Sequence, residues 1–91
     1  ETVAVEQGVP DGWRLQARVR ELTAVDTTFD VVLRGPDGEQ RIAGSDTLST
    51  AGLSDRFEQV DLEVELDRVD TVTFELHEGE LFVDDLRLVA P

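Results

Sequence analysis

Hydrophobic side chains recur at every second residue through most of this chain, and this alternation constrains the fold more than any other feature. In the clearest run, residues 60–66, Val and Leu alternate with Asp and Glu. The same period of two appears in residues 13–20, 29–33 and 72–76. Because successive side chains of a β-strand point to opposite faces, each run predicts a strand with one buried and one solvated face.

Turn sequences separate these runs. Gly-Pro-Asp-Gly at 35–38 predicts a hairpin into a short strand at 40–43, and Pro-Asp-Gly at 10–12 follows a first strand at 2–6. Glu-Gly at 78–79 leads into a last strand, residues 81–89. Residues 44–55 lack a sustained period and are predicted to be a long loop, with a helix over 50–58 as an alternative. Seven short strands without a covering helix predict an all-β sandwich of two antiparallel sheets.

Composition excludes several classes of protein. The chain has 91 residues, 21 of them acidic and 8 basic, for a net charge of −13. This charge repels nucleic acid, and no apolar run approaches the roughly 18 residues of a membrane span. Without Cys there is no disulfide framework and no thiolate metal site. We expect one domain over residues 1–91, and, since the sequence has no Met, a processed product or a piece of a longer chain.

The acidic residues also suggest that the protein works in concentrated salt. All eight basic residues are Arg, and the excess of Asp and Glu over them matches haloarchaeal proteins as a compositional class. Concentrated salt screens repulsion between carboxylates, so a halophilic protein tolerates such a surface. An acidic protein from an ordinary high-GC organism is the alternative, because high GC content also favours Arg over Lys.

The segment 81–88, Leu-Phe-Val-Asp-Asp-Leu-Arg-Leu, resembles the closing strand of jelly-roll carbohydrate-binding modules. Residues 12–19, 56–66 and 69–76 resemble earlier strands of the same modules. The resemblance implies a jelly-roll sandwich of about seven strands. It also implies a non-catalytic binding or accessory module of an extracellular or cell-surface protein, with a glycan or a cell-surface protein as its partner.

Sugar binding by such modules uses exposed aromatic rings, and this chain has few. Phe57 is the best candidate because it is out of phase with the run at 60–66. The other four aromatic residues are in phase with apolar neighbours and are predicted to lie in the core: Trp13, Phe29, Phe74 and Phe82.

Three arginines, Arg14, Arg18 and Arg20, are expected on the outer face of one strand. They form a candidate ligand-binding patch. The alternative is that they pair across the sheet with the acidic residues of 61–65.

The resembled family also implies a structural Ca²⁺ held by the first Asp of the pair Asp84-Asp85. Asp84 shares parity with Leu86 and Leu88, so its side chain is expected to point inward, where a carboxylate needs a partner. A Ca²⁺ ion with Glu6 as a further ligand would be such a partner. The alternative is that the Asp84 carboxylate accepts hydrogen bonds from Arg or backbone N–H groups.

No residue pattern indicates catalysis. His77, the only histidine, has no candidate nucleophile beside it and is expected to be a solvated residue at a strand end. We therefore expect a protein that is not an enzyme. The second functional hypothesis is a structural subunit or spacer in a surface assembly with no small ligand, in which the strand at 2–6, detached from its own sheet, pairs with the open edge of a neighbour.

Overall fold

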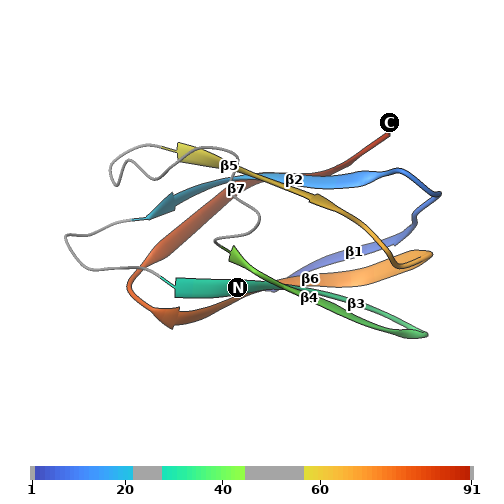
Figure 1. Cartoon of the computed structure of the whole chain (residues 1–91), viewed down its shortest axis with the longest axis horizontal. Helices are drawn as coiled ribbons and strands as arrows, with labels where there is room; N and C mark the ends of the chain where they lie inside the picture. The colour runs from blue at the N-terminus through green and yellow to red at the C-terminus, as the bar shows by residue number, and fades with distance from the viewer. Residues whose placement is uncertain (1, 22–27, 45–56, 91) are drawn as a thin grey trace.

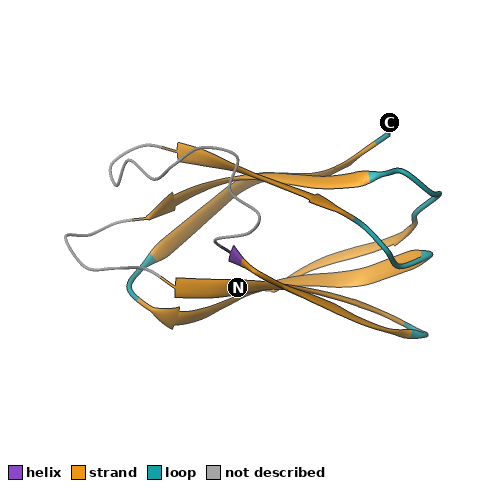
Figure 2. Ribbon diagram, in the orientation of Figure 1, coloured by secondary structure: helices purple, strands orange, loops and turns teal. Residues whose placement is uncertain are grey.

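A computed structural model describes residues 2–21, 28–44 and 57–90, which form two antiparallel β-sheets packed face to face (Figure 1). Almost all of this part of the chain is strand or tight turn (Figure 2). The strands are β1 (Thr2–Gly8), β2 (Arg14–Glu21), β3 (Thr28–Gly35), β4 (Gly38–Ala43), β5 (Phe57–Glu63), β6 (Arg68–Glu78) and β7 (Leu81–Val89). The predicted all-β sandwich of seven strands is confirmed.

The four-stranded sheet has the order β1-β6-β3-β4, and the three-stranded sheet has the order β5-β2-β7. The hairpin between β3 and β4, which turns at the predicted 35–38 motif, is the one connection between consecutive strands that stays within a sheet. Each of the other connections passes from one sheet to the other. Neighbouring strands in a sheet are therefore mostly distant in sequence.

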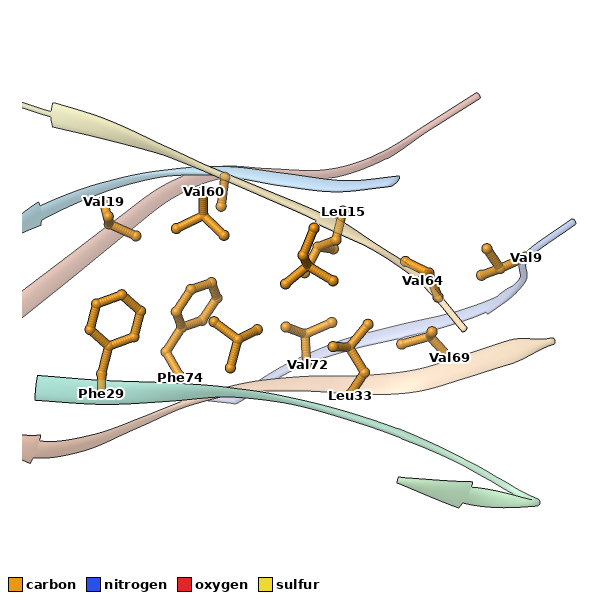
Figure 3. Packing of buried hydrophobic residues seen from close by; sticks show 13 residues of the cluster. Val9, Leu15, Val19, Phe29, Leu33, Val60, Val64, Val69, Val72 and Phe74 are labelled. Carbon is orange, nitrogen blue, oxygen red and sulfur yellow. The ribbon is translucent and has the colours of Figure 1, made fainter. Parts of the chain in front are cut away.

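The core lies between the two sheets and consists of the inward-facing residues of the alternating runs (Figure 3). Leu15, Val19, Val60 and Val72 are among its fully buried side chains. The rings of Phe29 and Phe74 lie at one end of the core with their centroids 6.3 Å apart, which confirms their predicted burial. Trp13 is half-buried and packs against the edge of the core.

β5, Phe57–Glu63, differs from the predicted run at 60–66 at both ends. β5 ends at Glu63. The N–H of Val64 still donates a 3.1 Å hydrogen bond to the carbonyl of Trp13, which continues the register one position beyond both strands, and Val64 remains buried. The helix alternative for 50–58 is wrong at residues 57–58, which belong to β5. The remainder of that helix, and residues 45–55 of the predicted loop, lie outside the described residues.

The predictions for the inner and outer faces of β7 also need correction. Phe82 is 51% exposed, because Val83 pairs with the buried Val19 and the alternation places Phe82 on the outer face. Asp84 is exposed as well, although it shares parity with the half-buried Leu86. The reason is a β-bulge: Asp84 pairs with Arg18 and Arg87 pairs with Gln16, so the two residues between Asp84 and Arg87 face one residue of β2.

Candidate functional site

The outer face of the three-stranded sheet holds the predicted arginine patch. β2 lies between β5 and β7, and Arg14 Nε donates a hydrogen bond of 2.6 Å to Asp61 Oδ1 on β5. Arg18 Nη1 lies 3.6 Å from Asp85 Oδ2 on β7. Cross-strand charge pairing with the acidic residues of β5 is therefore confirmed for Arg14. Arg18 instead pairs with Asp85 of β7, on the other side of β2. Both pairs are exposed, so each contributes little to stability.

Arg20 and Phe57 face each other in the register between β2 and β5. The structure thus brings these two predicted binding residues onto neighbouring strands. Their side chains lie outside the described part of the structure, so their role in binding stays a prediction.

The predicted calcium ligands lie on two edge strands, β1 and β7. Glu6 and Asp85 are exposed and adopt left-handed backbone conformations, with φ of 50° and 52°, each where the ladder register shifts. The N–H of Asp85 donates a 2.9 Å hydrogen bond to Asp84 Oδ1. Asp84 thus accepts a hydrogen bond from a backbone N–H, which was the predicted alternative to Ca²⁺ binding. The Ca²⁺ site itself stays a prediction.

A different cluster, on the outer face of the four-stranded sheet, was not predicted. It consists of Asp30 on β3, Arg41 on β4, and Glu75 and His77 on β6. Arg41 Nη1 donates hydrogen bonds to Asp30 Oδ2 (3.0 Å) and Glu75 Oε1 (3.1 Å), and its Nη2 donates to Glu75 Oε2 (3.3 Å). His77 Nε2 lies 3.2 Å from Asp30 Oδ2. His77 is exposed, as expected for a strand end, but it belongs to this network.

The cluster could hold a metal ion, because one ligand atom from each of Asp30, Glu75 and His77 lies within 4.8 Å of the others. Two carboxylates and an imidazole are ligands that suit Zn²⁺. The Arg41 guanidinium already donates hydrogen bonds to both carboxylates, however, so a metal ion must compete with it. Hydrogen bonds from His77 and Arg41 lower the pKa of Asp30, and a hydrogen bond from Arg41 lowers the pKa of Glu75. As described, the cluster is an ion-pair network.

The sequence held only part of the signal for this cluster. Glu75 and His77 are two residues apart, which places them on one face of a strand. Asp30 joins them because it is the register partner of Glu75 across the β3–β6 ladder. That pairing joins strands more than forty positions apart in the sequence, and no local pattern indicates it.

One side of the sandwich, formed by the edge strands β4 and β5, is bridged by Gln40 near the end of β5, and we call it the sealed side. The Gln40 Nε2 donates a 2.8 Å hydrogen bond to the carbonyl of Glu63, and the N–H of Glu65 donates a 2.9 Å bond to Gln40 Oε1. Gln40 is 8% exposed. Its amide therefore ties one edge of the four-stranded sheet to the end of β5.

The opposite side, formed by the edge strands β1 and β7, is open. A hollow of about 210 Å³ lies between them. Its lining includes the half-buried Val3 and Val5 of β1 and Leu86 and Leu88 of β7. Among the described residues no strand lies beyond β1 or β7 in either sheet. This open side therefore combines two unpaired backbone edges with partly exposed apolar side chains.

No protein-family model matches the chain, and neither a curated protein nor a solved structure matches it. Within the described ranges, none of the structure is a helix long and apolar enough to cross a membrane.

Proposed function

We propose that this chain is a non-catalytic interaction module of a surface assembly, and that it takes an extended strand from a partner chain onto its open side. The observation that carries the proposal is the difference between the two sides of the sandwich. The β4/β5 side is sealed by Gln40, whereas β1 and β7 leave apolar side chains half-exposed along two free edges. An extended peptide adds to such an edge through backbone hydrogen bonds and places alternate side chains in the groove.

The strand order supports a jelly-roll assignment within this proposal. A jelly roll has eight strands in two four-stranded sheets, and its first strand pairs with its last. The orders β1-β6-β3-β4 and β5-β2-β7 fit this plan if β1 to β7 correspond to its second to eighth strands. The first position would then lie beside β7, on the open side. An added strand would complete the second sheet. Placement in an extracellular or cell-surface protein rests on the resemblance to carbohydrate-binding modules.

The test is selection of extended peptides with alternating apolar and polar residues, in about 3 M NaCl, where charge repulsion is screened. We expect selected peptides to bind and to protect the amides of β7 from hydrogen exchange.

The matched variants are Val5→Lys and Ile42→Lys, each of which places a charge at a half-buried position of an edge strand. Val5→Lys, on the open side, is expected to weaken binding at least about tenfold, because an inward-pointing charge blocks strand addition. Ile42→Lys, on the sealed side, should bind as the parent does. The absence of bound peptides, or equal binding by folded Val5→Lys, would contradict the proposal.

Carbohydrate binding is the second candidate, and the exposure of Phe82 favours it. This ring is 51% exposed on the outer face of β7, in register with Arg20 and two positions from Asp84, the register partner of Arg18. An aromatic face with polar neighbours can stack on the apolar face of a sugar. A glycan-array signal that disappears in Phe82→Ala would support it, whereas the same signal in both proteins would assign binding elsewhere.

A further inference from the structure

The outer face of β7 carries a short pattern of residues with an approximate mirror symmetry. Asp84 and Arg87 lie on this face, on either side of the bulge, because their register partners Arg18 and Gln16 are two residues apart on β2. Phe82 precedes Asp84 by two positions and Val89 follows Arg87 by two positions. The order along the outer face is thus apolar, negative, bulge, positive, apolar.

We propose that the strand taken up by the open side is β7 of a second copy of this chain, so that two copies form a dimer with one continuous six-stranded sheet. This inference rests on the proposed strand-accepting function and names its partner. The two β7 strands run antiparallel about a two-fold axis at the bulge. Asp84 of each copy then faces Arg87 of the other, and Phe82 faces Val89.

Charge decides the register. When the two bulge residues, Asp85 and Leu86, are counted as one position, moving the second strand by two positions in one direction places Asp84 opposite Asp84 of the other copy. The same shift in the other direction places Arg87 opposite Arg87. Like charges directly opposite one another destabilise a pair of strands, and opposite charges stabilise it. Among these three registers with matching faces, the central one pairs unlike charges at both positions.

The inner face of the joined strands is apolar in this register. Val83 of one copy faces Leu88 of the other, and Leu86 lies opposite the bulge residue Asp85 of the other copy. Val83, Leu86 and Leu88 are half-buried and pack against the core of their own sandwich. Pairing would therefore cover the side chains that line the hollow between β1 and β7, together with the exposed ring of Phe82.

The bulge is compatible with pairing. The Asp85 N–H already donates to Asp84 Oδ1, and the Asp85 carboxylate lies 3.6 Å from Arg18 on β2, away from the free edge. Asp85 therefore does not place an isolated carboxylate against the facing strand. Because each copy carries a net charge of −13, the dimer requires salt to screen the general repulsion.

The experiment is sedimentation equilibrium of the full chain in about 3 M and about 0.1 M NaCl, at protein concentrations up to about 1 mM. We expect dimers in the high salt and monomers in the low salt. Arg87→Asp and Asp84→Arg, each alone, should weaken self-association at least about tenfold, because like charges then face each other at both positions.

Mixing the two single variants provides the decisive control. Each variant repels its own copy, but the mixture again places unlike charges opposite each other and should form a one-to-one heterodimer. Arg34→Glu, on the β3–β4 hairpin, should dimerise as the parent does. Circular dichroism checks that each variant is folded, and if Asp84→Arg alone is unfolded, Arg87→Asp still tests the interface.

A parent protein that stays monomeric in the high salt would overturn the inference, and so would folded Arg87→Asp that dimerises like the parent. If extended peptides still bind β7 in that case, the strand-accepting function stands and the partner is a different chain. If neither peptides nor a second copy bind, both proposals fail.

Discussion

The two sides of this sandwich differ in how the sheets meet. On the β4/β5 side one buried polar residue, Gln40, bonds to both a carbonyl and an N–H of the opposite edge. On the β1/β7 side, apolar residues of both strands line a hollow that remains accessible to solvent. The comparison shows that backbone groups at a sandwich edge can be satisfied by a side chain of the same domain. Among the described residues no strand lies beyond β1 or β7, so these two edges are available to another chain.

Two leucines show the same contrast within one sheet. Leu62 on β5 and Leu88 on β7 are both register partners of Leu15, on either side of β2. Leu62 is 4% exposed, whereas Leu88 is half-buried. Both face the same residue of β2, so the difference in burial follows from the side of the sandwich on which each strand lies.

The first prediction concerns salt, which acts on the whole molecule and tests whether both sides hold together without charge screening. We expect the urea midpoint to rise by about 1–3 M between 0.1 M and 3 M NaCl, or roughly 1–3 kcal/mol at an m value near 1 kcal/mol/M. The Debye length falls from about 10 Å at 0.1 M to about 3 Å at 1 M, so repulsion among 21 carboxylates is largely screened.

Chemical denaturation with KCl in place of NaCl controls for an effect of the specific cation. Hydrogen exchange at low salt should show β1 and β7 opening before β4 and β5. A midpoint that is equal or lower in the high salt would contradict the halophilic interpretation of the composition.

The second prediction compares the two leucines that flank Leu15. Leu62→Ala should lower the free energy of unfolding by about 2–4 kcal/mol, because it removes a buried side chain and leaves a cavity. Leu88→Ala should cost about half as much, since part of its surface is already in water. Urea denaturation of both variants at a concentration where the protein is monomeric measures the difference. Equal losses would show that the β1/β7 side is as closed as the opposite one.

The alternation of apolar residues was sufficient to predict the strands and the two-sheet architecture. The last strand was predicted with its observed ends, Leu81 and Val89. The inner and outer faces of that strand were not, because a bulge at Asp85 reverses the parity of every residue that follows it. A bulge depends on the backbone conformation of one residue, and a pattern that is apolar on both faces of residues 81–83 gives no sign of it.

The candidate site was harder to predict than the fold. The Arg14–Asp61 pair follows from two alternating strands once they are neighbours. The network around Arg41 joins three strands, and the Gln40 amide bonds to backbone groups that any residue type provides. Such contacts depend on strand order and register, which for most pairs here join segments far apart in the chain. Local patterns in a single sequence do not indicate strand order or register.

The third prediction tests the seal on the β4/β5 side. Gln40→Ala removes two hydrogen bonds and leaves the Glu63 carbonyl and the Glu65 N–H without their partner, so the expected loss of stability is about 2–3 kcal/mol. Gln7→Ala, an exposed position of the β1 edge, should change stability by less than about 0.5 kcal/mol. Thermal and urea denaturation give both values. A loss for Gln40→Ala no greater than for Gln7→Ala would show that the amide does not seal the side.

The smallest expected effect is the acid sensitivity of the same side, through the ion pairs that attach β4 to β3 and β6. The pKa values of Asp30 and Glu75 are lowered in the folded state by hydrogen bonds from His77 and Arg41. A carboxyl with a lowered folded-state pKa stabilises the fold above its ordinary pKa, and this contribution is lost as pH falls through the folded pKa. In about 3 M NaCl, where repulsion among the other carboxylates is screened, the urea midpoint should therefore decrease between about pH 5 and pH 2, and hydrogen exchange should show β4 loosening before β1. Asp30→Asn should make this decrease shallower, while Asp70→Asn, whose partner Arg68 lies on the same strand, should leave it unchanged. An identical pH dependence in Asp30→Asn and the parent would mean that the network does not hold β4 in place, and that Gln40 alone accounts for the sealed side.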